Sequence, residues 1–186
     1  MISEKELIQG CKKQKNKYQE MLYRQFYSFA MSVCLRYAPN TEDAREILND
    51  SFLKVFKHID DFDPEKPFKS WFRRILVNTA LDHYRINKKY RLQISYDAEE
   101  LEIMDGQYLT EEFQLNADEI LKMFKYLPEL LRVIFNLYEV EGYSHQEIAG
   151  MLDIAPGTSR SHLSRAKKML RKIYLDHRKK QRNEAV

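Results

Sequence analysis

The residues best suited to binding chemistry lie near the C-terminus, where arginine and lysine are interleaved with small hydroxyl side chains. Arginine and lysine can bind phosphates, and arginine, serine and threonine can reach base edges in a DNA groove. The residues predicted to make such contacts are Thr158, Arg160, Ser161, Ser164, Arg165 and Lys168. Residues 156–186 carry ten basic and two acidic side chains, which favours a polyanionic ligand. The alternative is an ordinary amphipathic helix whose basic face is only solvated.

These side chains need a helix to present them, and the local sequence predicts one that follows a shorter helix. Ser144 and Glu147 have the spacing of a capping box, which starts the shorter helix. Residues 153–157 break it, and Thr158 is predicted to cap the next helix. Two short helices joined by a tight turn form a helix-turn-helix. The second helix has an apolar stripe opposite its basic side, made of Leu163, Ala166, Leu170, Ile173 and Tyr174.

A second group of polar side chains lies on a helix predicted from Phe68 to about Asn87. The apolar positions with helical spacing are Phe68, Phe72, Ile75, Leu76 and Thr79. A separate stripe contains Trp71, Arg74, Asn78, Asp82 and Arg85. An amide, two guanidinium groups and an aromatic ring could hold phosphates and an unstacked base. Two alternatives stay open: Asp82 could pair with Arg85 along the helix, and Trp71 fits a hydrophobic core better than a base-stacking position.

A third group lies on a helix for which Thr41 is the predicted N-cap, with Glu42 and Asp43 in the first turn. Its apolar stripe consists of Ala44, Leu48, Phe52, Val55 and Ile59. The opposite face contains Glu46, Asn49, Asp50, Leu53 and Lys54. An apolar residue within a charged face is typical of a protein interface. A solvated helix face is the simpler alternative.

Charge is distributed along the chain in blocks. Over all 186 residues the net charge is only +3, yet residues 92–120 contain nine acidic and no basic side chains. Basic blocks lie on both sides, at residues 88–91 and 121–186. Basic blocks favour nucleic acid, whereas an acidic stretch between them must avoid it or imitate it. Because residues 88–117 lack clear periodicity, we expect a linker there.

The rest of the composition indicates an all-α protein. Five glycines, five prolines and 32% charged residues fit long helices with few tight turns. Ser3 is predicted to cap a first helix that ends at about Lys15, and a second helix spans residues 17–37. Residues 60–67 are predicted to form a loop. Pro128 suits the first turn of a further helix that ends at Gly142.

Several classes of function are disfavoured by the sequence. No apolar run is long enough to span a membrane. Cys11 and Cys34 lie outside any CxxC motif, so we expect reduced thiols in a cytosolic protein. No nucleophile–base pair, glycine-rich phosphate loop or metal-ligand spacing is present, so the sequence predicts no catalytic residue, metal or cofactor.

Two segments resemble a known family. Residues 142–149 (GYSHQEIA) and 156–166 (PGTSRSHLSRA), after Leu127-Pro128, resemble region 4 of sigma factors. Residues 43–56 (DAREILNDSFLKVF) and 68–85 (FKSWFRRILVNTALDHYR) resemble region 2. The order and spacing of both match the small extracytoplasmic-function (ECF) type. Ser159 and His162 depart from the pattern, because a small aliphatic residue and an arginine are common there.

The resemblance implies a cytoplasmic, non-enzymatic protein of two helical domains: region 2 at residues 1–90, a flexible acidic linker at 91–117, and region 4 at 118–186. The implied partners are core RNA polymerase, through its β′ clamp and β flap, promoter DNA, and an anti-sigma factor. The face with Leu53 would bind the clamp, the fourth helix and the loop at 61–69 would read the −10 element, and region 4 the −35 element. The linker would either mimic RNA or act as a tether. A conventional helix-turn-helix regulator would explain only the C-terminal part.

Overall fold

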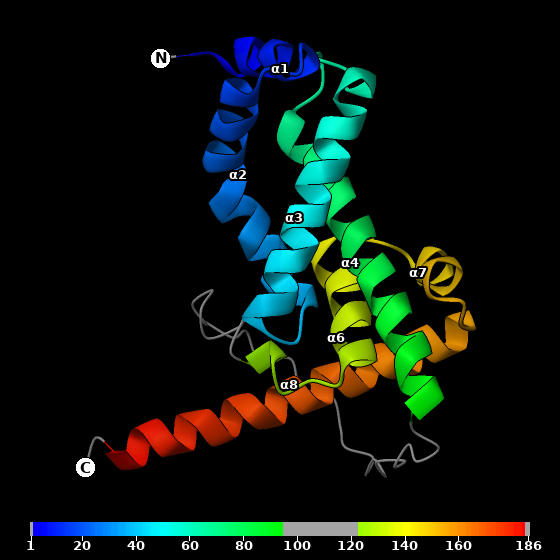
Figure 1. The fold of residues 1–186 in the computed structure, drawn as a ribbon. Helices are drawn as coiled ribbons and strands as arrows, with labels where there is room; N and C mark the ends of the chain where they lie inside the picture. Colours follow the sequence, from blue (N-terminus) through cyan, green and yellow to red (C-terminus); the bar gives the residue numbers. More distant parts are fainter. Residues whose placement is uncertain (1, 95–122, 185–186) are drawn as a thin grey trace. The chain divides into compact units, whose positions relative to one another are not determined.

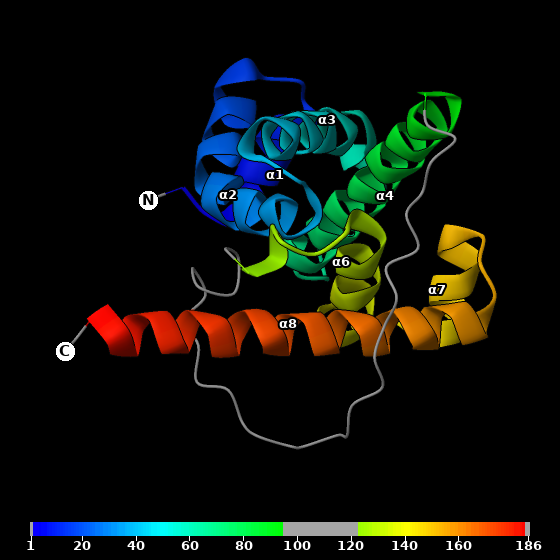
Figure 2. The ribbon, with the colours of Figure 1, turned by 90° about the horizontal axis from the view of Figure 1, so that it is seen from below.

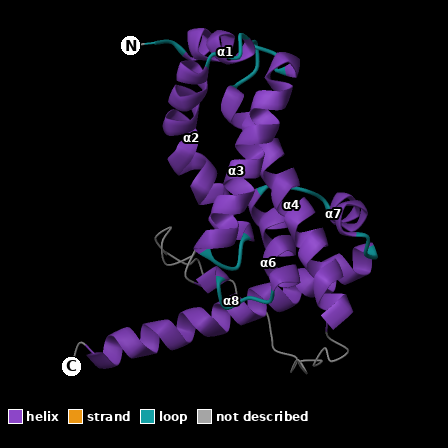
Figure 3. Cartoon of the chain, in the orientation of Figure 1, coloured by secondary structure: helices purple, strands orange, loops and turns teal. Residues whose placement is uncertain are grey.

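A computed structural model describes residues 2–94 and 123–184, and every regular element in these two ranges is helical (Figures 1 and 3). The chain divides into two compact units, Met1–Arg85 and Ile86–Val186. Most of the predicted linker at 91–117 lies outside the described residues. None of the described helices is both long and apolar enough to cross a membrane.

The first unit is a bundle in which consecutive helices pack on one another. Helix α1 packs on α2, α2 packs on α3, and the short turn η1 contacts both α1 and α3 (Figure 1). The elements are α1 (Glu4–Lys12), α2 (Asn16–Tyr37), α3 (Thr41–His58), the 3-10 turn η1 (Ile59–Asp61) and α4 (Phe68–Ile94). The all-α fold predicted from composition is therefore confirmed for the described part of the chain.

The ends of these helices agree with the sequence prediction at some positions and differ at others. Ser3 and Glu6 form a complete capping box at the start of α1, as the prediction for Ser3 required. The prediction that Thr41 caps α3 is wrong, because the side chain of Asn40 accepts the bond from the Asp43 N–H at 2.8 Å. Helix α4 continues past Asn87 to Ile94, so residues 88–94, which were predicted to belong to the linker, are helical.

The core of the first unit is rich in aromatic rings. Phe72 lies 4.8 Å from Phe52, and Phe68 lies 4.8 Å from Phe26, both between ring centroids. The apolar stripe predicted for α3 is confirmed, since all five of its members are buried. Trp71 is half-buried, with its ring packed against Phe62 and Phe68, so it lies at the edge of this core rather than inside it. These contacts fix α3 and α4 as neighbours, so polar side chains on both helices can meet.

Both cysteines belong to this interior. Cys11 and Cys34 are free thiols and fully buried. Burial raises the pKa of Cys11 to about 11 and that of Cys34 to about 12. At neutral pH both are therefore protonated and poor nucleophiles.

The second unit is built around one long helix. Its elements are α6 (Glu129–Phe135), the π-helical turn η2 (Asn136–Val140), α7 (His145–Leu152) and α8 (Pro156–Glu184). Helices α6 and α7 both pack on α8, as Figure 2 shows. The core cluster contains Phe124, Leu127, Leu131 and Ala166. The two predicted C-terminal helices are present as α7 and α8, but α8 is longer than the short helix expected, because nothing after Gly157 in residues 158–184 is a strong helix breaker.

Two backbone positions shape the turns around α7. Gly142 has a φ of +79°, a conformation that glycine adopts without steric cost, and it lies between η2 and α7. Asp153 ends α7 in the left-handed conformation, with a φ of 54°. Aspartate tolerates this region better than most residues. The chain then turns and α8 begins three residues later, which completes the predicted helix-turn-helix.

Candidate protein and nucleic-acid interfaces

The predicted protein-binding face of α3 is largely open to solvent. Glu46, Asn49, Asp50 and Leu53 are exposed, and Lys54 is half-buried. Leu53 is 66% exposed, and it is the apolar member of this face. The Tyr23 hydroxyl of α2 donates to Asn49 Oδ1 at 3.4 Å. The face thus combines an exposed leucine with polar and charged neighbours, and its role in binding a partner stays a prediction.

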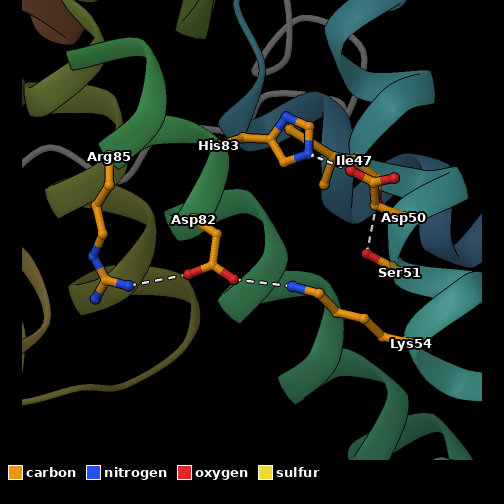
Figure 4. A network of polar contacts seen from close by, with 7 residues as sticks. All are labelled: Ile47, Asp50, Ser51, Lys54, Asp82, His83 and Arg85. Atoms are coloured by element: carbon orange, nitrogen blue, oxygen red, sulfur yellow. Dashed lines mark hydrogen bonds and ion pairs between the residues drawn. The ribbon is translucent and has the colours of Figure 1, made fainter. Parts of the chain in front are cut away.

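A network of ion pairs connects α3 with α4 (Figure 4). Lys54 Nζ lies 2.9 Å from Asp82 Oδ2, and Arg85 Nη1 donates to Asp82 Oδ1 at 3.1 Å. Asp82 therefore pairs with Arg85 along the helix, the alternative that the sequence left open. The same carboxylate also binds a lysine that was predicted to contact a different partner. The two predicted surfaces thus meet at Asp82.

A second pair lies one turn away in the same view. His83 Nε2 and Asp50 Oδ2 are 2.8 Å apart (Figure 4). The neighbouring Ser51 hydroxyl is buried and donates to the Ile47 carbonyl oxygen at 2.6 Å. Sequence reasoning missed His83, because it lies on α4 between residues assigned to DNA. Only its position beside Asp82 hinted at a role, and nothing local connects it with Asp50.

Two residues of the predicted α4 stripe are exposed to solvent. Arg74 and Asn78 are exposed at a spacing of four residues, so they lie on one side of the helix. Asp82 and Arg85 continue that side toward the ion pairs with α3. The structure therefore divides the stripe into two parts. Arg74 and Asn78 are accessible to a ligand, whereas the Asp82 carboxylate is already paired with Lys54 and Arg85.

The helix-turn-helix is fixed locally by its first cap. The Ser144 side chain accepts from the Glu147 N–H at 3.3 Å, and Glu147 Oε2 accepts from the Ser144 N–H at 2.8 Å. The predicted capping box is confirmed. These bonds from the backbone and hydroxyl of Ser144 lower the pKa of Glu147, so its carboxylate stays charged.

Helix α8 exposes three of its six predicted binding residues to solvent. Arg160, Ser161 and Arg165 are exposed, whereas Thr158, Ser164 and Lys168 are half-buried. The prediction that Thr158 caps this helix is wrong: α8 begins at Pro156, and the first backbone bond runs from Ser159 N–H to Ala155 O at 3.1 Å. Thr158 lies inside the first turn instead, where its carbonyl oxygen accepts from the Ser161 hydroxyl at 2.9 Å.

Polar contacts hold the first turns of α8 against the elements before it. His145 Nδ1 lies 2.9 Å from Ser159 Oγ, and Lys167 Nζ lies 2.7 Å from Glu139 Oε1. The His145 ring also stacks on Tyr138, with centroids 4.4 Å apart and planes at 21°. Burial, together with the positive charges of Arg160 and Lys167, lowers the pKa of His145. The imidazole is therefore neutral at pH 7.

No group of three or more histidine, cysteine or acidic side chains in the described ranges, 2–94 and 123–184, is arranged to hold a metal ion. What the described residues do provide is hydrogen-bonding and ionic contact: amide, hydroxyl and guanidinium groups on two helices and a partly apolar face on a third.

Comparison with known proteins places these features in one family. The model of sigma-70 region 2 matches residues 22–90, and that of sigma-70 region 4 matches residues 117–170. RNA polymerase sigma-H factor of Pseudomonas aeruginosa is 25% identical over 162 residues, covering 82% of this chain and 84% of that relative. ECF RNA polymerase sigma-E factor of Salmonella typhimurium is 28% identical over 178 residues, covering 91% of this chain and 93% of that relative.

Among solved structures, the sigma factor RpoE in complex with the anti-sigma factor NepR from Bartonella quintana is 21% identical, with 83% of this chain and 95% of that chain covered and a TM-score of 0.47. The two matched regions occur in the order that sigma factors have and together span about two thirds of the chain. The chain belongs to the sigma-70 family, as a factor of the ECF type. It is a transcription initiation factor that acts with RNA polymerase at promoters.

Proposed function

We propose that the protein binds the β′ clamp of core RNA polymerase through the exposed face of α3, reads the −10 element with α4, and reads the −35 element with the first turns of α8. The observation that supports this division most strongly is the helix-turn-helix, whose second helix exposes Arg160, Ser161 and Arg165. Region 4 would also contact the β flap. In this assignment residues 1–90 form region 2, residues 91–117 the linker and residues 118–186 region 4.

The experiment that tests the assignment is transcription in vitro with purified core polymerase. On a promoter selected from the host genome by mapping transcript starts after overexpression, the protein should produce a defined start that core polymerase alone does not. We propose that the protein has no catalytic activity of its own and works in the cytoplasm, where polymerase and chromosome are found. A transcript pattern identical to that of core polymerase alone would contradict the proposal.

The −10 assignment rests on the open part of the α4 stripe. Arg74 can bind a backbone phosphate, and the Asn78 amide can pair with the edge of a base that has left the stack. Asp82 holds Arg85 from one side and Lys54 from the other, so it acts by positioning rather than by direct contact. Asn78 is therefore the residue most suited to reading a base.

We expect Asn78→Ala to relax base preference at one −10 position by about fivefold, because it removes one hydrogen bond worth about 1 kcal/mol. Selectivity for the −35 element should be unchanged. Binding of holoenzyme to promoters randomised separately in each element measures both effects. Asn16→Ala, an exposed asparagine at the start of α2, is the matched control. A shift in −35 preference caused by Asn78→Ala would contradict the assignment.

We further propose that an anti-sigma factor controls the protein. A promoter-reading subunit with an open polymerase-binding face would otherwise direct transcription continuously. A partner that covers Leu53 and the exposed side of α8 would block polymerase and DNA together. The acidic residues of the linker lie outside the described ranges, and their role as an RNA mimic or as a tether stays a prediction.

A further inference from the structure

We propose that the hydrogen bond between His145 and Ser159 is the contact that orients the recognition helix α8, so that Arg160 and Ser161 meet the bases of the −35 element. Ser159 and His145 are thus positioning residues for promoter specificity, although neither is proposed to touch DNA. The proposal deepens, and rests on, the function proposed above for α8.

Ser159 is a polar residue in an otherwise apolar stripe. It is fully buried, and the next inward positions of α8, Leu163 and Ala166, are buried as well. A buried hydroxyl is costly unless it is hydrogen-bonded, and His145 Nδ1 at 2.9 Å supplies the partner. Because the pKa of His145 is lowered, its ring is neutral, and either tautomer can complete this bond with the hydroxyl.

The partner ring is itself held in place. Tyr138 stacks on His145 from η2, the element that precedes α7. His145 is the first residue of α7, directly after the Ser144 cap. The imidazole is therefore fixed on one side by the cap and on another by the stacked phenol, and its Nδ1 presents a defined direction to α8.

The position of this bond matters because it lies beside the reading residues. Ser159 directly precedes Arg160 and Ser161, and each residue turns a helix by about 100°. A small aliphatic residue at 159 would make only non-directional contact, which permits α8 to rotate or slide. A hydrogen bond has preferred distance and angle, so it fixes the rotation of the helix. The Lys167–Glu139 pair, about two turns further on, restrains α8 at a second point.

The test uses the full-length protein bound to core polymerase. Ser159→Ala removes the hydroxyl, and His145→Phe keeps a ring to stack on Tyr138 but has no nitrogen. Both should reduce discrimination among −35 sequences by about fivefold, the effect of losing one hydrogen bond on specificity. The double variant should be no worse than either single one, because both changes remove the same contact. Discrimination at the −10 element should stay as in the wild type.

His145→Asn is the conservative variant, because the asparagine amide places a polar atom near the position of Nδ1. It should restore most of the −35 discrimination that His145→Phe loses. Ser28→Ala, an exposed serine on α2, is the matched control and should change nothing. Circular dichroism and melting temperature of each variant separate loss of orientation from loss of folding.

Wild-type −35 discrimination in Ser159→Ala, even with a lower melting temperature, would overturn the proposal and leave the contact a purely structural one. Additive losses in the double variant would overturn it as well. If the wild-type protein itself shows no −35 discrimination, the function proposed for α8 fails instead, and the two failures are thereby distinguished.

Discussion

Leu53→Glu should weaken binding of the protein to core polymerase by at least about 30-fold while leaving its helical content unchanged. Leu53 is 66% exposed on α3, so the substitution costs no core packing. At the centre of an interface, an apolar anchor contributes about 2 kcal/mol or more, and a buried carboxylate in its place adds a desolvation penalty. Fluorescence anisotropy of labelled protein titrated with core polymerase measures the loss.

Gln25→Glu on α2 makes the same change of charge at an exposed position and is the matched control. Wild-type affinity in Leu53→Glu would place the polymerase interface elsewhere. Asp50 is a poorer choice for this experiment, because it pairs with His83 at 2.8 Å. A substitution there would disturb α4 as well as the binding face.

Arg165→Ala should cost about 1–3 kcal/mol in promoter binding, roughly 5- to 150-fold, if the guanidinium contacts a base edge. The loss should map to one position of the −35 element and leave −10 preference intact, because Arg165 is exposed on α8. Binding of holoenzyme to duplexes that differ singly in the −35 element measures the effect. A phosphate contact would instead weaken all sequences equally and reduce the salt dependence.

Arg178→Ala removes the same charge from the same helix, 13 residues further on and about 20 Å away, and provides the control. It should change affinity little and base preference not at all. If Arg165→Ala altered only −10 preference, the assignment of the two reading helices would be reversed.

The features that the sequence predicted correctly depend on local pattern. The capping box at Ser144 and Glu147 needs only a spacing of three, and the apolar stripe of α3 needs only helical periodicity. The family resemblance rested on longer motifs and is confirmed by both region models.

The errors arose where several nearby residues could do the same task. Asn40 and Thr41 can both cap a helix, and asparagine, the better of the two, forms the cap of α3. Thr158 has a capping hydroxyl, but Pro156 is suited to the first turn and the helix starts there. Local propensity thus indicates that a helix begins, whereas the exact residue depends on how the turn before it packs.

The ion pairs between α3 and α4 could not be predicted from the sequence, because their members are far apart along the chain. Lys54 and Asp82 are 28 residues apart, and Asp50 and His83 are 33 apart. Helical periodicity predicts which residues share one face of a helix. It does not predict which face of α3 packs against which face of α4. Only the packing of the aromatic core, with Phe52 against Phe72, brings these charges together.

Because Lys54 and Asp82 share an ion pair, the surface that would bind polymerase and the surface that would read DNA are not genetically independent. A screen for variants that fail to bind polymerase would recover changes at Asp82 and His83, although both belong to α4, the helix proposed to read the −10 element. Suppressors of a change on one helix would arise on the other. If evolutionary change in the polymerase favoured a new residue at position 54, the ion pair with Asp82 would change as well. The set of promoters that the protein can evolve to recognise would thereby be constrained.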